Sequence, residues 1–126
     1  CVFCCSSHSA FAAVQLDAGM SFVDKVRADL ESAPVSPKLR SLLRIAGAVQ
    51  RSGRAVTTEL IDAARAEGAD DLEIHDTVLI AAAFCMFNRY VDGLGTLAPP
   101  TREDYAPMGQ QIVEFGYAAA TPPIPD

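Results

Sequence analysis

The sequence predicts an all-α fold of about six helices. Apolar residues recur every three or four positions along most of the chain, helix-capping residues precede these stretches, and no segment shows the polar–apolar alternation of a strand. Half of the 126 residues are hydrophobic and 21% are charged, which suits one domain of ordinary size with its own core. We therefore expect a single compact helical domain over residues 1–126, with an extended, proline-rich tail over residues 119–126.

The first two helices are predicted between the N-terminus and Pro34. Apolar residues continue at helical spacing from the initial cysteine motif to Gly19, a residue type that commonly ends helices. Ser21, followed three residues later by Asp24, resembles a capping box. We expect Gly19 to stop the first helix and Ser21 to cap the second.

The third and fourth helices have clearer limits. Ser36-Pro37 supplies an N-cap and a proline at the first helical position, and the apolar stripe that follows ends near Gly53. Thr57 or Thr58 can cap a short helix that Gly68 ends.

The fifth helix is the most apolar. Asp70 with Glu73 predicts its start, and it runs from about residue 72 to 91 with apolar residues on nearly all sides, so we expect it to lie at the centre of the fold. Its longest apolar stretch, residues 77–87, falls short of the roughly 20 residues that span a bilayer, so no membrane partner is expected. Residues 101–104 predict the capped start of a last helix.

The charge balance excludes some functions. Sixteen acidic residues against ten basic ones give a net charge of -6 without any basic run, so a nucleic acid would be repelled. No positively charged leader precedes an apolar segment, and we expect a soluble cytoplasmic protein. Because the chain lacks an initiator Met and begins inside its cysteine motif, we expect it to be truncated upstream of Cys1.

That motif is the strongest chemical signal. Cys1, Cys4 and His8 are spaced so that a helix would project all three side chains from one face. A thiolate rather than a thiol is the nucleophile, and a nearby histidine and a helix N-terminus both promote the thiolate. The arrangement therefore favours thiol redox chemistry.

Three other interpretations of the motif remain open. Cysteines at a helix start can simply be small core residues. A structural zinc site would need a fourth ligand besides Cys1, Cys4 and His8, and Cys5 would point about 100° away from Cys4 on a helix. As a mature N-terminal residue, Cys1 could also act as an amide hydrolase nucleophile activated by its own amine.

Other reactive residue types have ordinary structural explanations. Cys85 lies within the apolar helix and is expected to be buried and inert, and His75, among acidic residues, to be a solvated surface residue. Arg89 is expected to pair with a carboxylate. No phosphate-binding loop, serine-hydrolase motif or zinc-protease motif is present, so nucleotide binding, serine-hydrolase and zinc-protease functions have no motif support.

Several motifs together resemble one protein family, the AhpD-like alkylhydroperoxidase branch of the carboxymuconolactone decarboxylase superfamily. The residues that carry the resemblance are C1-x-x-C4-x-x-x-H8, Ser36-Pro37 before Arg40-Ser41-Leu42-Leu43, Phe84, Phe87-Asn88-Arg89 and Asp92-Gly93-Leu94-Gly95. The chain looks most like a peroxidase-related member without its N-terminal part. The resemblance implies a helical AhpD-like domain that forms a homo-oligomer.

The resemblance also implies roles for the cysteine motif. Cys4 would attack a hydroperoxide, Cys1 would resolve the sulfenic acid into a disulfide, and His8 would belong to a proton relay, with an external thiol or lipoyl reductant and without metal, haem or flavin. The family's relay includes a glutamate upstream of the first cysteine, which this chain does not contain. Cys5, next to the implied nucleophile, and Cys85, where relatives often carry a second Asn, also depart from the pattern.

Two further functions remain open. A thiol-disulfide oxidoreductase would act on a protein or lipoyl partner, with only incidental peroxide turnover. A scaffold or interaction domain would have kept the fold while the site lapsed, and the absent glutamate motivates this alternative.

Overall fold

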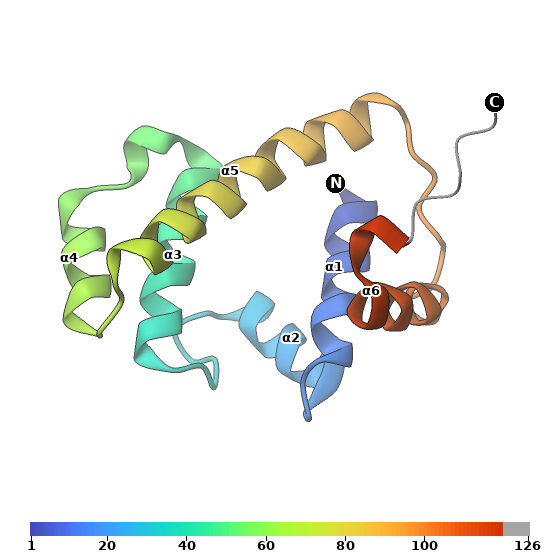
Figure 1. The fold of residues 1–126 in the computed structure, drawn as a ribbon, viewed down its shortest axis with the longest axis horizontal. Helices are drawn as coiled ribbons and strands as arrows, with labels where there is room; N and C mark the ends of the chain where they lie inside the picture. Colours follow the sequence, from blue (N-terminus) through green and yellow to red (C-terminus); the bar gives the residue numbers. More distant parts are fainter. Residues whose placement is uncertain (120–126) are drawn as a thin grey trace. The chain divides into compact units, whose positions relative to one another are not determined.

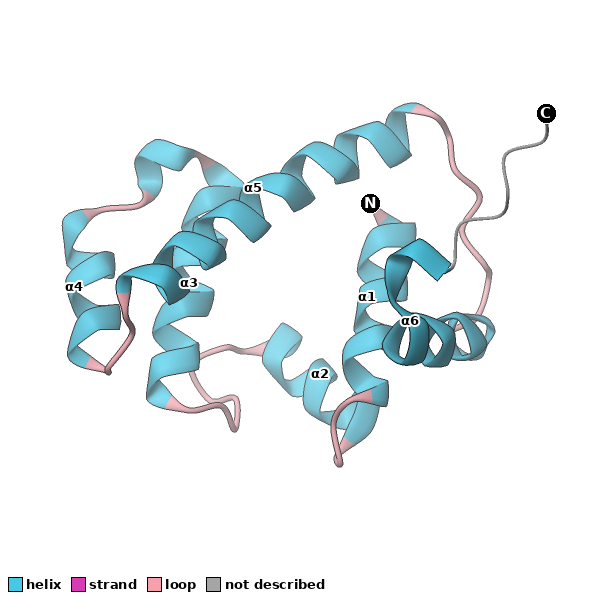
Figure 2. Ribbon diagram, viewed as in Figure 1, coloured by secondary structure: helices cyan, strands magenta, loops and turns pink. Residues whose placement is uncertain are grey.

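The structure, a computed structural model, describes residues 1–119 (Figure 1). These residues form six α-helices and two short 3₁₀ helices, and Figure 2 shows no strand among them. The prediction of an all-α fold with about six helices is confirmed. The extended tail predicted for residues 119–126 falls outside the described residues, apart from Ala119, which ends the last helix.

The helices follow the predicted order along the chain. Their bounds are α1 Val2–Val14, α2 Gly19–Ala28, α3 Pro37–Arg51, η1 Gly53–Ala55, α4 Thr58–Ala66, α5 Asp71–Gly93, η2 Glu103–Tyr105 and α6 Ala106–Ala119. Within residues 1–119, no helix combines the length and the apolar character that crossing a membrane requires.

Backbone contacts divide the chain into two units, which we describe separately. Among the described residues, unit 1 combines Cys1–Ala33 with residues 91–119, and unit 2 is Pro34–Tyr90. Unit 1 therefore contains α1, α2, η2 and α6, while unit 2 contains α3, η1, α4 and most of α5. The expectation of one folding domain over residues 1–126 stays a prediction.

Two of the predicted helix caps in unit 2 are present. The Ser36 hydroxyl accepts a hydrogen bond from the Leu39 N–H at 3.1 Å, as an N-cap does. At the start of α5, Asp70 Oδ1 accepts from the Glu73 N–H at 2.7 Å and Glu73 Oε2 accepts from the Asp70 N–H at 2.9 Å, which makes a reciprocal capping box. Lys38 donates to the other Glu73 oxygen at 2.6 Å, and these two donors, Lys38 first, hold the pKa of Glu73 below its usual value.

The predicted cap of the second helix is wrong. The helix begins at Gly19, and the Ser21 hydroxyl donates to the Ala18 carbonyl at 2.8 Å instead of accepting from a backbone N–H. The Asp24 carboxylate instead accepts a hydrogen bond at 2.9 Å from Arg102, which is distant in the sequence. The side chain that the local pattern predicts as part of a helix cap therefore forms a long-range ion pair.

The core of unit 2 joins three helices and the loop between α4 and α5. Its buried residues are Ile45, Ala64, Ala69 and Ile74, against which Leu42, Val56, Leu60, Ile61 and Val78 also pack. The close approach of helices here depends on small side chains, since Ala64 is fully buried.

The prediction that the fifth helix lies buried at the centre is wrong. Within the described structure only Ile74 of α5 is buried, whereas Leu79, Met86 and Tyr90 are 57%, 59% and 65% exposed. The face of α5 that carries Ile74 and Val78 packs on the core of unit 2. Within unit 2 nothing covers the opposite face, which we call the open face of α5, because a 23-residue helix that is apolar on nearly all sides presents more apolar surface than the short helices of this unit cover.

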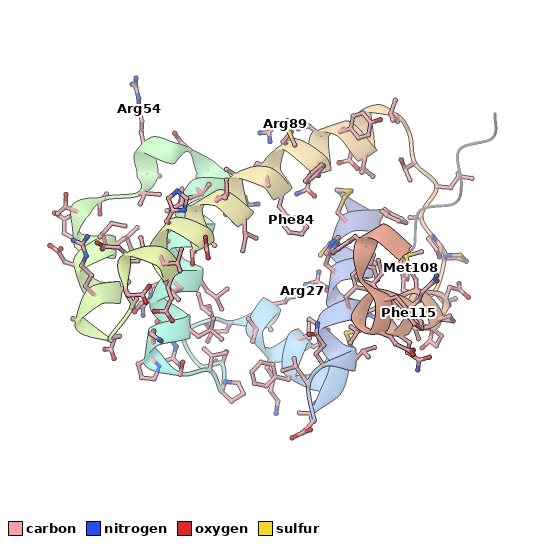
Figure 3. The ribbon with its side chains drawn as sticks, viewed as in Figure 1. Arg27, Arg54, Phe84, Arg89, Met108 and Phe115 are labelled. Carbon is pink, nitrogen blue, oxygen red and sulfur yellow. A yellow bond between two sulfur atoms is a disulfide. The ribbon has the colours of Figure 1, made fainter. Side chains whose placement is uncertain are left out.

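The core of unit 1 is formed where α1 meets α6 and η2. Ala10, Phe11 and Tyr105 are buried there, with Phe3, Met20, Met108 and Ile112 packed against them. Figure 3 shows Met108 on α6 near α1. This packing fixes one side of α1, the helix that begins with the cysteine motif.

The Asp24–Arg102 pair predicts a specific loss of stability in acid. The hydrogen bond from Arg102 lowers the pKa of Asp24 below its ordinary value of 3.8. The unfolded chain therefore binds a proton at a higher pH than the folded chain, so the pair stabilises the fold above the unfolded pKa and its contribution is lost as pH falls through the lower folded pKa. In Asp24→Asn the free energy of unfolding should decrease less steeply than in wild type as the pH is lowered from about 5 to about 2. Urea unfolding followed by circular dichroism measures this slope. Asp62→Asn, at an exposed position on α4, should keep the wild-type slope, and equal slopes in wild type and Asp24→Asn would contradict the prediction.

Candidate functional site

The cysteine motif forms the first turn of α1. Cys1 is the N-cap residue, and its sulfur accepts a hydrogen bond from the Cys4 N–H at 3.2 Å. A sulfur here takes the place of the Ser or Asp oxygen that usually caps a helix. Negative charge on Cys1 would be stabilised by this N–H and by the helix N-terminus.

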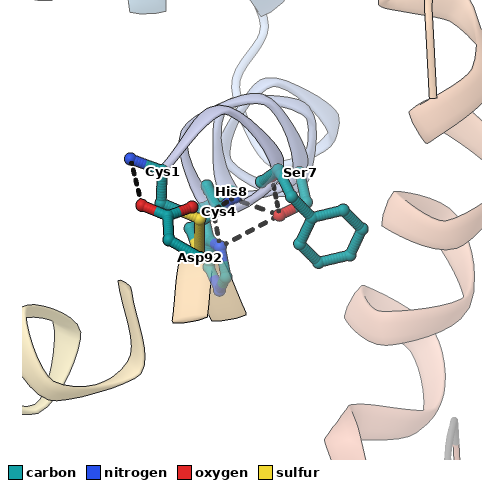
Figure 4. Close-up of a disulfide and its surroundings, with 6 residues drawn as sticks. Cys1, Cys4, Ser7, His8 and Asp92 are labelled. Atoms are coloured by element: carbon teal, nitrogen blue, oxygen red, sulfur yellow. Dashed lines mark hydrogen bonds and ion pairs between the residues drawn. A yellow bond between two sulfur atoms is a disulfide. The ribbon is translucent and has the colours of Figure 1, made fainter. Parts of the chain in front are cut away.

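The structure joins Cys1 and Cys4 in a disulfide whose Cα atoms lie 5.4 Å apart (Figure 4). Both sulfurs are sheltered, since the Cys1 side chain is 1% exposed and Cys4 is 7% exposed. Residues three apart on a helix are neighbours in any protein, so the bond alone does not distinguish a catalytic disulfide from a structural one.

His8 lies one helical turn after Cys4, as predicted. Its Nδ1 is 2.9 Å from the Cys4 carbonyl oxygen and 3.2 Å from the Ser7 hydroxyl. Ser7 is 1% exposed, and its hydroxyl donates to the Phe3 carbonyl at 2.8 Å. The structure thus places Cys1, Cys4 and His8 within the first two turns of one helix and orients the imidazole through the backbone of Cys4.

Tyr117, on α6, contacts the other side of the imidazole. Its hydroxyl lies 2.8 Å from His8 Nε2, and the two rings stack with centroids 6.2 Å apart. Phe11 completes the aromatic group, with its ring centroid 5.0 Å from that of His8. Sequence reasoning missed Tyr117 because 109 residues separate it from His8 and no motif surrounds it.

A carboxylate also lies beside the motif. Asp92 Oδ2 is 3.3 Å from the backbone nitrogen of Cys1, and Figure 4 shows its side chain next to the disulfide. The resemblance had implied a glutamate upstream of Cys1. Asp92 belongs to the segment that carries the resemblance near the end of α5, but nothing in the sequence placed it near the cysteines.

The remaining candidate residues lie elsewhere. Cys5 is an exposed free thiol, and Cys85 is a free thiol of intermediate exposure, so the expectation that Cys85 is buried is wrong. His75 is 73% exposed beside Asp76, as expected of a surface residue. Arg89 donates to the Cys85 carbonyl at 2.6 Å rather than to a carboxylate of the described residues, because that carbonyl lies one turn back along the same helix.

The described residues contain no group of three or more His, Cys, Asp or Glu side chains arranged to hold a metal ion. The zinc interpretation needed both Cys1 and Cys4 as thiolate ligands, and here their sulfurs are bonded to each other.

Comparisons of the chain with protein-family models, with curated proteins and with solved structures found no match. The resemblance to the AhpD-like branch therefore rests on the quoted motifs, and the function argued below rests on the geometry of α1 and its neighbours.

The alignment of α6 with α1 depends on Gly109. A Cβ atom at this position would lie 3.3 Å from Val14 Cγ2 and 3.4 Å from both the Ala10 carbonyl and the Phe11 ring. The lack of a side chain allows the two helices to approach closely, which in turn brings Tyr117 to His8.

Substitutions of two helical glycines should therefore have opposite effects. Gly109→Val should lower the free energy of unfolding by about 1–3 kcal/mol, as overpacking does. Gly47→Ala, whose new Cβ would meet nothing within 4 Å, should raise it by about 1 kcal/mol through helix propensity. Urea unfolding at constant pH measures both. No loss of stability in Gly109→Val would contradict this account of the α1–α6 contact, and Gly47→Ala serves as the control for adding a side chain to a helical glycine.

Proposed function

We propose that the chain reduces hydroperoxides through a dithiol–disulfide cycle of Cys1 and Cys4, with His8 in the proton relay. The observation that supports this proposal best is the pair of sheltered sulfurs in the first turn of α1, joined by a disulfide, with an imidazole held one turn away. The motif resemblance to AhpD-like alkylhydroperoxidases points the same way. A cycle that an external thiol must complete suits the reducing cytoplasm.

The cycle balances without metal, haem or flavin. A Cys4 thiolate attacks one peroxide oxygen, the O–O bond breaks, and the leaving alkoxide takes up a proton to become an alcohol. The Cys1 thiol then attacks the sulfur of the Cys4 sulfenic acid, which forms the disulfide and releases water. Two thiols and one hydroperoxide thus give a disulfide, an alcohol and water. An external thiol or lipoyl reductant returns two electrons and two protons.

One observation favours a second function, thiol-disulfide exchange with a protein or lipoyl partner. The Cys4 N–H contacts the Cys1 sulfur, so the helix N-terminus stabilises a thiolate on Cys1 rather than on Cys4. In that function Cys1 would attack the partner disulfide and Cys4 would resolve the mixed disulfide. The family resemblance therefore predicts Cys4 as the nucleophile, whereas the cap geometry predicts Cys1. Experiments on single-cysteine variants distinguish the two.

Single-cysteine variants should identify the nucleophile. Cys4→Ser should lower the rate of peroxide reduction by at least about a hundredfold, because it removes the attacking group. Cys1→Ser should accumulate a sulfenic acid on Cys4, which a dimedone adduct reports by peptide mass spectrometry. Cys85→Ser serves as the control and should keep the wild-type rate.

The outcomes separate the alternatives. Retained turnover in Cys4→Ser with a sulfenic acid on Cys1 would assign the nucleophile to Cys1 and overturn the role of Cys4. Slow peroxide turnover with fast exchange against a dithiol partner would favour the oxidoreductase. Unchanged thiols after one equivalent of an organic hydroperoxide and of a disulfide would favour a scaffold domain.

We also propose that the chain forms a homodimer through the open face of α5. Leu72, Leu79 and Met86 recur every seven residues along this face, the spacing of a helix–helix seam, and all three are exposed. An apolar stripe of this length is typical of an interaction surface.

Side-chain size favours an antiparallel arrangement. If two copies cross at Ala82 and Ala83, Leu79 of each copy faces Met86 of the other. The small alanines permit close approach at the crossing, and the two-fold axis repeats each contact.

Sedimentation equilibrium tests the interface. The wild-type chain should have the mass of two chains and Leu79→Glu the mass of one, because the new carboxylate would be buried without a partner. Ala63→Glu, which adds the same charge at an exposed position on α4, should remain dimeric. A wild-type mass of one chain would overturn the proposal.

A further inference from the structure

The Tyr117 side chain, which comes from α6, hydrogen-bonds to the histidine of the motif. The imidazole has polar neighbours at both nitrogens: the Cys4 carbonyl at 2.9 Å and the Ser7 hydroxyl at 3.2 Å from Nδ1, and the Tyr117 hydroxyl at 2.8 Å from Nε2. The contacts with Cys4 and Tyr117 have ordinary hydrogen-bond lengths. The ring is therefore held at both nitrogens, once from its own helix and once from α6.

The chemistry of the two partners determines the histidine tautomer. A backbone carbonyl can only accept a hydrogen bond, so Nδ1 must carry the proton. In the neutral ring Nε2 then has the lone pair, and the Tyr117 hydroxyl donates to it. Since a hydroxyl can both donate and accept, the same contact persists when Nε2 is protonated, with the direction of the bond reversed.

The backbone of α6 is shaped to make this contact. Gly116 interrupts the helix with φ 75° and ψ 176°, a conformation that is essentially limited to glycine. A continuous helix would carry residue 117 about 100° around the helix axis from residue 116. The break instead directs Tyr117 to His8.

We infer that Tyr117 is a positioning residue that holds His8 with Nε2 as its basic nitrogen and passes protons between Nε2 and solvent. Tyr117 is 61% exposed, whereas the Cys1 side chain and Cys4 are almost fully sheltered. Protons that enter or leave the sheltered thiols during a redox cycle need a path to water. Tyr117 would form the outer end of that path, between His8 Nε2 and solvent. This catalytic consequence rests on the proposed function, whereas the tautomer does not.

The two histidines of the chain permit a direct test of the tautomer. Long-range ¹H–¹⁵N spectra of histidine-labelled protein should show His8 with its proton on Nδ1. In Tyr117→Phe the spectra should shift toward the Nε2–H form, which predominates for free histidine in water. Exposed His75 is the internal reference. Gly116→Ala should reproduce the effect of Tyr117→Phe, because alanine disfavours the backbone conformation that presents Tyr117.

Thiol kinetics test the relay. In Tyr117→Phe, the rate of Cys4 alkylation by iodoacetamide should fall about tenfold, less than the 10²–10⁴ that a full acid–base group supplies, and its pH profile should change shape. Asp62→Asn, at an exposed position on α4 away from both the cysteine motif and the open face of α5, should match wild type in rate and profile. Circular dichroism should be the same for all three proteins.

Each outcome is decisive. An unchanged His8 tautomer in Tyr117→Phe would overturn the inference, and a changed tautomer with an unchanged pH profile would overturn the relay. If the wild-type chain did not reduce hydroperoxides, the proposed function would be wrong. The spectra and the alkylation rates would still test the role of Tyr117, because neither measurement requires peroxide turnover.

Discussion

The first two turns of α1 are the constraint on which the rest of the site depends. They carry Cys1, Cys4, Ser7 and His8, so the helical repeat alone brings two sulfurs together and puts an imidazole one turn away. Tyr117 and Asp92, which come from other helices, add contacts to an arrangement that α1 alone already provides. Phe11 and Ala10, one turn further on, anchor this helix in the core of unit 1.

Elements specified by local chemistry were predictable from the sequence. Ser36-Pro37 and the Asp70/Glu73 pair mark helix starts through contacts within four residues, and the structure contains both. The cysteine motif belongs to the same group, because spacing along one helix determines which of its side chains are neighbours. The all-α class followed from the same periodicity, repeated over most of the chain.

Features that depend on distant partners were not predictable. Asp24 was assigned to a local cap, yet it binds Arg102, 78 positions along the chain. Tyr117 and Asp92 reach the cysteine motif only through tertiary packing, and spacing along a single sequence carries no signal of such contacts. For helix α5 the prediction of burial was wrong. Its apolar composition favours contact with other apolar surfaces, but composition alone does not tell whether those surfaces belong to the same chain or to another one.

The position of the disulfide within a single turn has a consequence for recognition. The Cα atoms of Cys1 and Cys4 are 5.4 Å apart, the ordinary separation of residues three apart on a helix, so the bond can open and close without backbone movement. Oxidised and reduced chains would then present nearly the same surface. A reductant could not recognise the spent form by its shape, and would have to reach the sheltered sulfur atoms themselves.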